Sequence, residues 1–225
     1  SKQAVIDMAK WISYVFNGSD SLFATIFAIK KSGSHGAKNI ITGSYPFDRG
    51  TANLMVTLLN AWHLTDDFSY IESVQTIILD SIHPLDNISD RGLDNIEKTW
   101  FYTVFLQALI SYLQLKEQLS QLDSCFYYAR DSLLHYASWM LLNESPYLDK
   151  AEQLEFPNNT WTAQDIRKAD VMMAASYYSN HKNEEYRKWA NTMYSYIKNK
   201  LSICETKDTS RILAILMQNN GVGYF

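Results

Sequence analysis

Glycine and proline are scarce in this sequence. Its 225 residues include Gly 8 and Pro 4, about 5 % of the chain where average usage gives roughly 12 %. A sandwich or barrel of short strands needs turn residues every ~8–12 positions, so the composition argues against both. A hydrophobic fraction of 47 % provides ample apolar material for a core, which excludes intrinsic disorder.

The usual signatures of metal, phosphate and nucleic-acid chemistry are also missing. Cys125 and Cys204 stand far apart, without CxxC or Cys/His spacing, so neither a zinc site nor a disulfide framework is indicated. No HExxH or HxxxH pair, glycine-rich phosphate loop or G-x-S-x-G elbow occurs. Lys+Arg 20 against Asp+Glu 24 gives a net charge of −4 without a basic run, which argues against a nucleic-acid partner. We expect no cofactor and no metal ion.

Long hydrophobic runs are absent as well. No stretch approaches ~18 uncharged apolar residues, and no secretory-signal pattern opens the chain. We therefore expect a soluble domain without a membrane span, cytoplasmic by default. The length fits a single domain of residues 1–225. Because the chain starts at Ser1 and a helical pattern begins almost at once, we expect it to be part of a longer polypeptide.

Helical periodicity is what the sequence does contain. Apolar residues at three-and-four spacing predict helices over 2–16 and 19–31. The same spacing then predicts three helical hairpins, over about 48–82, 93–140 and 159–197, and a last helix over 209–217. Thr160 or Thr162 is the expected N-cap of the third hairpin.

The two helices of each predicted hairpin differ in character. The first helices, which open near residues 48, 96 and 161, carry small and apolar residues nearly all round, as helices buried on both sides do. The returning helices have one charged and one aromatic face. Openings roughly 48 and 65 residues apart are too long and too uneven for a 34-residue tetratricopeptide array. The predicted fold class is all-α, with helical hairpins forming an α/α toroid or an incomplete sector of one.

The segments that lead into the predicted inner helices are rich in polar and aromatic residues. In a toroid these segments gather at one rim, so we expect them to line a shared cleft. A carbohydrate site needs an aromatic platform, hydrogen-bonding groups and carboxylates for acid–base chemistry. The candidates are Arg49, Trp100, Tyr102, Trp161, Gln164, Arg167 and Lys168 for substrate binding, and Asp48, Glu97, Glu155 and Asp165 for catalysis.

The third of these segments has the most suggestive spacing. Offsets of three, one and three place Trp161, Gln164 or Asp165, and Lys168 on one face of a helix. A cleft lined by that face would present an aromatic ring beside a carboxylate and an ammonium group.

The carboxylates allow either mechanism of glycoside hydrolysis. Glu155 or Asp165 would serve as the acid, and Glu97 or Asp48 as the base or nucleophile. A separation of ~5–5.5 Å between the two carboxylates would suit retention of configuration, and ~6.5–9.5 Å would suit inversion. The alternative is structural: Asp165 serves the free amides of a helix start, and Arg167 binds Asp48 or Glu155 to tie adjacent hairpins together.

Three runs of sequence resemble a known group of proteins. DRGTAN at 48–53, WFYTVFLQAL at 100–109 and LEFPNNTWTAQDIRK at 154–168 look like a bacterial family of uncharacterised proteins with a six-hairpin-glycosidase-like toroid. The wider superfamily contains glycoside hydrolases, polysaccharide lyases and sugar epimerases. The resemblance therefore implies a carbohydrate-active domain with a poly- or oligosaccharide partner, and it transfers no catalytic assignment.

A different class of function also fits the pattern. Six hairpins need twelve helices, and about eight are readable in this chain. An open barrel would favour a non-catalytic helical-hairpin scaffold or protein-interaction domain, in which the same polar residues tie the hairpins to one another.

Overall fold

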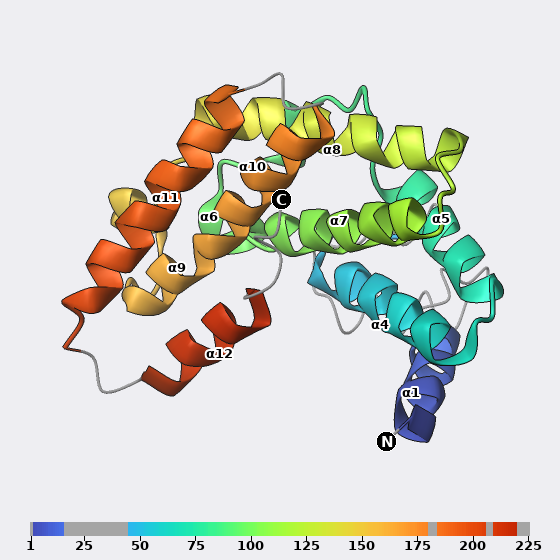
Figure 1. Ribbon diagram of the computed structural model, residues 1–225. Coiled ribbons are helices and arrows are strands. Elements are labelled where there is room, and N and C mark those ends of the chain that lie inside the picture. Colours follow the sequence, from blue (N-terminus) through green and yellow to red (C-terminus); the bar gives the residue numbers. More distant parts are fainter. Residues whose placement is uncertain (1, 16–44, 180–183, 206–208, 220–225) are drawn as a thin grey trace.

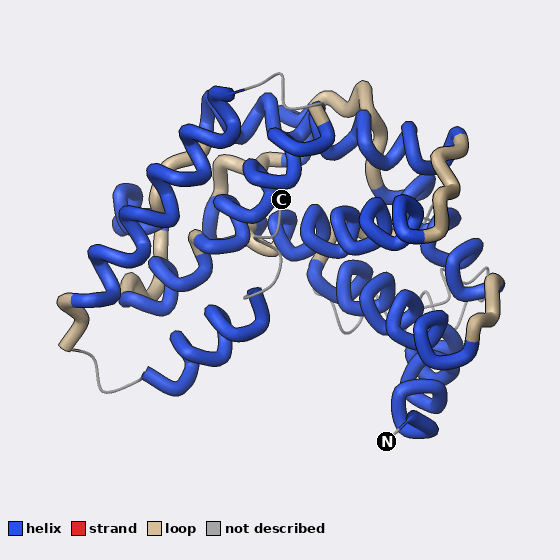
Figure 2. The backbone as a smooth tube through the Cα atoms, in the orientation of Figure 1, coloured by secondary structure: helices blue, strands red, loops and turns tan. Residues whose placement is uncertain are grey.

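Every regular element in the described part of the chain is a helix (Figure 2). The computed structural model describes residues 2–15, 45–179, 184–205 and 209–219. Its α-helices are α1 (Lys2–Val15), α4 (Arg49–Thr65), α5 (Ser69–Ser81), α6 (Ile96–Thr99), α7 (Tyr102–Gln118), α8 (Ser124–Asn143), α9 (Asn159–Gln164), α10 (Ile166–Tyr178), α11 (Glu184–Ser202) and α12 (Thr209–Asn219), with 3-10 helices η2 (Ile88–Arg91) and η3 (Tyr147–Gln153). The prediction of an all-α fold is confirmed. The predicted helix over 19–31 lies outside the described residues.

Three antiparallel hairpins form the body of the molecule. Helix α4 packs on α5, α7 on α8, and α10 on α11. Helix α7 also packs on both α4 and α10, so the first helices of the three hairpins lie in one row (Figure 1). Helix α1 packs on α4 at one end of this row, and α12 packs on α9 and α10 at the other. Closure of the row into a toroid remains a prediction.

Inner and outer helices differ in burial as the sequence indicates. Helix α7 is buried on several sides, and its buried residues include polar ones such as Gln107 and Lys116. Helix α11 buries a single stripe, made of Tyr186, Ala190, Met193 and Ile197. That spacing of three and four residues is the mark of a helix with one face on the core.

Helix boundaries follow local capping chemistry. Asp48 is the N-cap of α4, and its carboxylate accepts a hydrogen bond from the backbone N–H of Thr51 at 2.8 Å. Helix α9 is capped by Asn158, whose Oδ1 accepts from the N–H of Thr160 at 2.9 Å. The prediction of Thr160 or Thr162 as this cap is wrong, because the extended backbone of Asn158 already places an acceptor at the free amides.

Two of the inner helices are interrupted near their starts. The second predicted hairpin opens with the short helix α6. A turn at Trp100 and Phe101 then interrupts the helix before α7 begins. The hydroxyl of Thr103 donates to the carbonyl oxygen of Trp100 at 2.9 Å across this break. The third opens with α9, which ends at Gln164 before α10 begins. The prediction of one continuous helix in each place is wrong. Trp100 directly follows the short helix α6, and Trp161 lies within the short helix α9.

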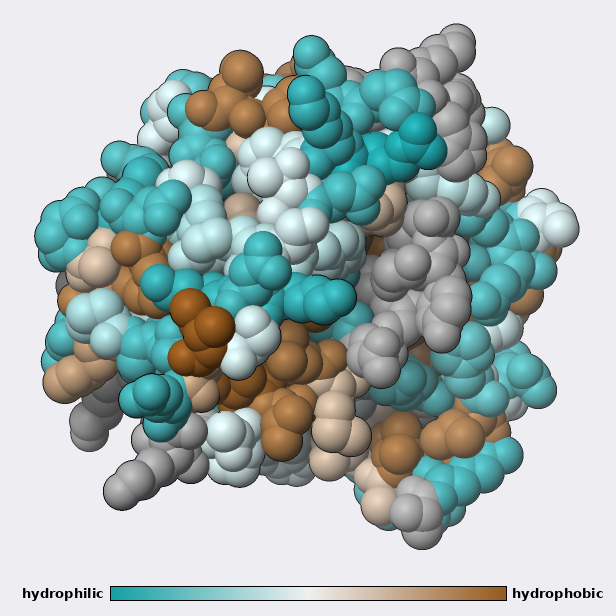
Figure 3. Space-filling view, turned by 60° about the vertical axis from the view of Figure 1, so that its left-hand side comes forward, coloured by the Kyte–Doolittle hydropathy of each residue, from teal (hydrophilic) through white to brown (hydrophobic). Residues whose placement is uncertain are grey.

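The side of the molecule that carries α9, α11 and α12 is mostly hydrophilic, with apolar side chains gathered below its centre and a smaller group at its upper edge (Figure 3). The exposed large apolar residues of α12 and of the segment before it are Ile203, Leu213 and Met217. Among the described residues, no helix combines the length and the apolar character needed to cross a membrane.

Candidate functional site

The predicted meeting of three remote segments is confirmed. Trp100, after α6, and Trp161, in α9, have ring centroids 5.9 Å apart and ring planes at 86°. The guanidinium carbon of Arg49, at the start of α4, lies 6.0 Å from the centroid of the Trp100 ring. The row α4, α7 and α10 therefore brings the starts of all three hairpins to one place.

A small cavity opens beside the two tryptophans. Its volume is about 220 Å³, and it is lined by Glu97, Trp100, Phe156, Asn158, Thr160, Trp161, Gln164 and Arg211. Four of these residues, namely Glu97, Trp100, Trp161 and Gln164, are candidates from the sequence. The structure thus supplies an aromatic wall with amide, hydroxyl and charged groups around it.

The tryptophans are held in fixed positions by their neighbours. The indole N–H of Trp161 donates to the carbonyl oxygen of Phe156 at 3.2 Å, and its ring lies 5.4 Å from that of Tyr147. Both tryptophans pack on a small apolar cluster that includes Ile96 and Tyr147. They remain half-buried, so part of each ring is available to a ligand.

Two of the predicted catalytic carboxylates are neighbours at this cleft. Glu97 lies in α6 and lines the cavity, and its Oε2 accepts a hydrogen bond from the backbone N–H of Glu155 at 3.1 Å. Glu155 itself is exposed. The contact joins the first turn of the second hairpin to the segment that leads into the third.

The other two predicted catalytic residues are engaged elsewhere. The carboxylate of Asp48 caps α4, as described above. Asp165 is fully buried between α9 and α10, and its two oxygens accept from the backbone N–H of Tyr147 at 3.1 and 3.3 Å. Asp165 makes no side-chain capping bond to α10, so the structural alternative that it serves the amides of that helix is wrong.

Asp165 belongs to a buried charged cluster beneath Tyr147. Lys168 is fully buried, with its Nζ 2.7 Å from Glu144 Oε2 and 3.3 Å from Asp165 Oδ1. The same ammonium group lies 3.3 Å from the ring centroid of Tyr147. Tyr102, also buried, donates its hydroxyl to Glu144 Oε1 at 2.7 Å. Lys168 and Tyr102 therefore lie in the core, and neither is on the cavity wall.

Burial shifts the protonation of this cluster. It raises the pKa of the Asp165 carboxyl to about 7, while the positive charge of Lys168 and the amide of Tyr147 act in the opposite direction. Burial, followed by the charge of Glu144, holds the pKa of the Tyr102 hydroxyl well above its usual range.

The predicted single face of Trp161, Gln164 or Asp165, and Lys168 does not form. A one-residue turn at Asp165 separates α9 from α10, so these residues do not belong to one regular helix. Trp161 and Gln164 line the cavity, whereas Asp165 and Lys168 bond to each other in the core. Their position makes them supports of the site rather than groups that a ligand can touch.

Arg167 enters a second polar network, formed with neutral amides. Its Nε donates to Gln164 Oε1 at 2.8 Å and its Nη1 donates to Gln107 Oε1 at 2.6 Å. The predicted alternative, a tie from Arg167 to Asp48 or Glu155, is wrong. Gln107 occupies the middle of α7 and brings an acceptor close enough to take that place.

The network continues through Gln107 to α11 and α12. The Nε2 group of Gln107 donates to Asp170 Oδ2 at 2.9 Å and to Asn219 Oδ1 at 2.6 Å. Tyr194 donates its hydroxyl to Asp170 Oδ1 at 2.6 Å. Burial raises the pKa of Asp170 to about 7, against hydrogen bonds from Tyr194 and Gln107 that act in the opposite direction. Four helices are thus joined by one buried carboxylate and two amides.

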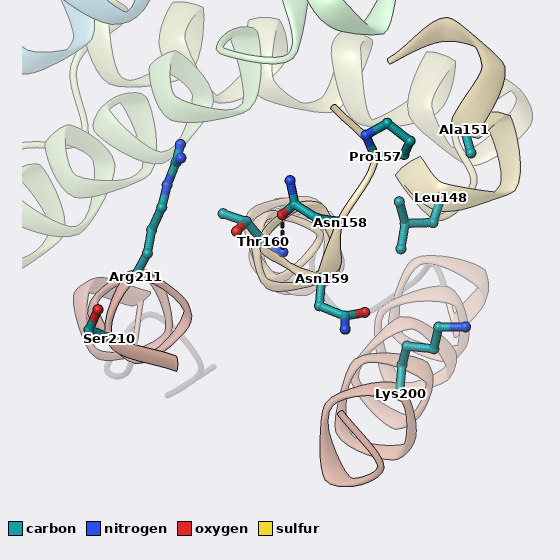
Figure 4. A pocket seen from close by; sticks show the side chains of 9 residues that line it. All are labelled: Leu148, Ala151, Pro157, Asn158, Asn159, Thr160, Lys200, Ser210 and Arg211. Atoms are coloured by element: carbon teal, nitrogen blue, oxygen red, sulfur yellow. Dashed lines mark hydrogen bonds between the residues drawn. The ribbon is translucent and has the colours of Figure 1, made fainter. Parts of the chain in front are cut away.

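A larger cavity adjoins the first around the start of α9. It measures about 860 Å³ and is lined by Leu148, Ala151, Pro157, Asn158, Asn159, Thr160, Lys200, Ser210 and Arg211. In Figure 4, Asn158 and Thr160 lie in the middle, with Arg211 of α12 on one side and Lys200 of α11 on the other. The two cavities share Asn158, Thr160 and Arg211 as lining residues, so they lie next to each other.

Several residues of this site are missed by sequence reasoning. Arg211 sits in the last helix, far from the segments that carried the prediction, and nothing in its neighbourhood marks it. Glu144 and Tyr147 flank Ser145-Pro146, a signal for a chain turn that indicated nothing about their charged partners. Asn158 could have been found, because an asparagine followed by a helical pattern is a common N-cap.

No metal centre accompanies these groups in the part of the chain that is described. Within those residues, no group of three or more histidine, cysteine, aspartate or glutamate side chains is placed to hold a metal ion. Comparison of the chain with family models, curated proteins and solved structures gives no match. The resemblance to six-hairpin-glycosidase-like proteins therefore stays a prediction from the three sequence runs.

Proposed function

We propose that this chain is a carbohydrate-active domain that binds a poly- or oligosaccharide beside Trp100 and Trp161. The observation that carries the proposal is the meeting of these two tryptophans, from segments about sixty residues apart, on the wall of a polar cavity. The cavity volume of about 220 Å³ lies below the ~300–1,000 Å³ of pockets for drug-sized ligands. It therefore suits a single sugar unit of a longer chain.

The lining chemistry matches the two faces of a sugar. Aromatic rings that are fixed and half-buried offer apolar area at little cost in conformational entropy, and they suit the C–H face of a pyranose. Gln164, Asn158 and Thr160 line the same cavity and provide amide and hydroxyl groups for the sugar hydroxyls. The carboxylate of Glu97 is the acidic group on this wall.

Any acid–base chemistry in the proposal falls to Glu97 and Glu155. Asp48 is committed to its helix cap and Asp165 to the buried cluster. Glu97 and Glu155 are adjacent and accessible, as a hydrolase or lyase pair needs to be.

Trp100→Ala and Trp161→Ala test the proposal directly. A glycan array identifies the saccharides that the wild-type chain binds, and titration calorimetry then compares the variants. We expect each variant to weaken binding by roughly 5- to 150-fold, because ring contacts of this size contribute roughly 1–3 kcal/mol. Trp11→Ala, on an exposed tryptophan of α1, is the matched control and should bind as wild type. Equal binding by all four proteins would overturn the proposal, and circular dichroism checks that each variant is folded.

A scaffold function is the second candidate, and one observation favours it. Asp165, Lys168 and Tyr102 all lie buried in ties between helices, as the structural interpretation requires. A pure scaffold would bind no saccharide on the array, and Glu97→Gln would then change no measured property. Binding by wild type and its loss in Trp161→Ala would exclude this candidate.

A further inference from the structure

The six arginines of this chain divide into two sets. Arg91, Arg130 and Arg187 each have a carboxylate oxygen at 2.6–2.8 Å. The other three, Arg49, Arg167 and Arg211, form no ion pair with any carboxylate among the described residues.

The three arginines without a carboxylate gather at the tryptophan cleft. Arg49 lies over the Trp100 ring, and Arg211 lines both cavities. Arg167 is bonded to Gln164, which lines the smaller cavity. Burial lowers the pKa of the Arg167 guanidinium, and the positive charge of Arg49 adds to the lowering. Tyr147 and the charge of Asp170 act on this pKa in the opposite direction.

Like charges at one place cost free energy unless an anion offsets them. The carboxylate on this wall, Glu97, accepts a hydrogen bond from the backbone of Glu155 and forms no ion pair with the three arginines. Arg167 meets amide oxygens of Gln107 and Gln164, which carry no charge. The cleft therefore has excess positive charge beside its aromatic wall.

We infer that the saccharide bound here is acidic, with its anionic group held by Arg49 and Arg211 beside Trp100 and Trp161. The inference rests on the proposed function and names its substrate class. A guanidinium group donates two parallel hydrogen bonds to a carboxylate or sulfate group. Such charge-assisted hydrogen bonds are stronger than hydrogen bonds between neutral groups. A carboxylated sugar such as a uronic acid unit is the simplest ligand that offers both an apolar ring face and an anion.

The adjoining cavity extends the same chemistry. Lys200 and Arg211 both line it (Figure 4), and Lys200 is exposed and without an ion pair among the described residues. An oligomer with a charge on successive units would meet Arg49 and Arg211 at the tryptophans and Lys200 farther along. We therefore expect a chain of several acidic units to bind more tightly than one unit.

Titration calorimetry with matched ligands tests the inference. The probes are oligogalacturonate, a sulfated oligosaccharide and a neutral oligosaccharide of similar length. We expect wild type to bind the acidic probes at least tenfold more tightly than the neutral one. Arg49→Gln and Arg211→Gln should each lose tenfold or more in affinity for the preferred acidic probe. The control Arg187→Gln, which removes one positive charge from a surface ion pair of α11, should stay within about twofold.

The outcomes separate the inference from the function on which it rests. Tighter binding of the sulfated than of the carboxylated probe would support the inference, with sulfate as the anionic group. Equal affinity for neutral and acidic probes, or unchanged affinity in Arg49→Gln and Arg211→Gln, would overturn it while the saccharide function stands. If wild type binds none of the three probes and nothing on the glycan array, the proposed function fails, and this inference with it.

Discussion

Lys168 shows how much of the cleft depends on groups that no ligand touches. Its ammonium group contacts Glu144, Asp165 and the backbone carbonyl oxygen of Ser145, the last at 2.7 Å. It also lies under the ring of Tyr147, and this ring packs on Trp161. The position of the aromatic wall is thus coupled to a charge that is completely removed from solvent.

Removal of that charge should be costly. Lys168→Met leaves two carboxylates without their buried partner, and breaking such a contact destabilises proteins by roughly 3–5 kcal/mol. We expect a loss of this size in the free energy of unfolding, measured by urea denaturation. Lys198→Met, at an exposed lysine of α11, is the control and should change stability by less than about 0.5 kcal/mol. Equal effects of the two substitutions would contradict the role given to the cluster.

Asp48 offers a test between two roles at one residue. If it acts only as the cap of α4, Asp48→Asn should keep stability and saccharide binding, because asparagine caps as well as aspartate. Asp48→Ala should lose about 1 kcal/mol in the free energy of unfolding, again by urea denaturation. A catalytic carboxylate, by contrast, requires turnover to disappear in Asp48→Asn while stability is unchanged.

At this scale the sequence identified the right neighbourhood and placed some side chains wrongly. Arg49, Trp100 and Trp161 converge as predicted because each lies at the start of an inner helix. The prediction that Lys168 shares the cleft face with Trp161 is wrong. Helical spacing assumes one uninterrupted helix, whereas a turn at Asp165 separates α9 from α10. Interruptions of this kind depend on tertiary hydrogen bonds, which spacing does not encode.

At the scale of elements, the turn between α7 and α8 combines a cap with a buried charge. Asp123 Oδ1 accepts from the N–H of Phe126 at 3.0 Å and caps α8. Its Oδ2 lies 2.6 Å from the Nζ of Lys116, a side chain that is 1 % exposed. Gln121 Oε1 accepts from the same ammonium group at 3.0 Å. One carboxylate therefore has two separate tasks, because it both caps α8 and pairs with a buried lysine of α7.

Two substitutions at Asp123 should separate these tasks. Asp123→Asn keeps a capping oxygen and loses the charge beside Lys116, whereas Asp123→Ala loses both. We expect Asp123→Ala to destabilise by roughly 1 kcal/mol more than Asp123→Asn, the usual value of a cap, in chemical denaturation. Asp131→Ala, at the exposed acid of a surface ion pair, provides the control. Identical losses in both Asp123 variants would show that the cap contributes nothing.

The sequence predicts most of the helices, but it predicts the residues at which they begin and end less well. Periodicity alone predicts α4, α5, α7, α8, α10 and α11, since each buries an apolar face at three-and-four spacing. The cap of α4 is of the usual chemical type, because Asp48 stands directly before the first residue of that helix. The breaks before α7 and α10 are not predicted. Asp165, between α9 and α10, accepts a hydrogen bond from Tyr147, which folding brings in from another element. The bond from Thr103 to Trp100 before α7 is local, and the spacing of apolar residues does not encode it.

At the scale of the whole molecule, Asp170 connects elements that are remote in sequence. Through Gln107 and Tyr194 it joins α10 to α7 and α11, and Gln107 extends the connection to Asn219 of α12. Asn219 is buried although it lies at the end of the last described helix. Polar contacts as well as apolar packing therefore hold α12 against the inner helices at this end of the row.

The raised pKa of Asp170 makes stability depend on pH. Its ordinary value is 3.8 and its folded value is about 7, so between these values the folded state holds a proton that the unfolded state has lost. The stabilisation of the folded state by this proton is fully present below pH 3.8 and is lost as pH rises through about 7. We expect the free energy of unfolding of the wild type to fall by on the order of 2 kcal/mol between pH 5 and pH 8 because of this group.

Asp170→Asn, which has no proton to lose, should show a weaker fall over the same range, with the remainder due to Asp165. Urea denaturation at unit steps of pH measures both proteins. Parallel curves for wild type and variant would contradict the assignment.

The indole N–H signals of the six tryptophans test the central claim most directly. Each gives one peak in a ¹H–¹⁵N spectrum, and single Trp→Phe variants assign them. On titration with the saccharide that binds best, we predict shifts of the peaks of Trp100 and Trp161, with those of Trp11, Trp62, Trp139 and Trp189 unchanged. A saccharide that binds while the peaks of Trp100 and Trp161 stay in place would contradict the account.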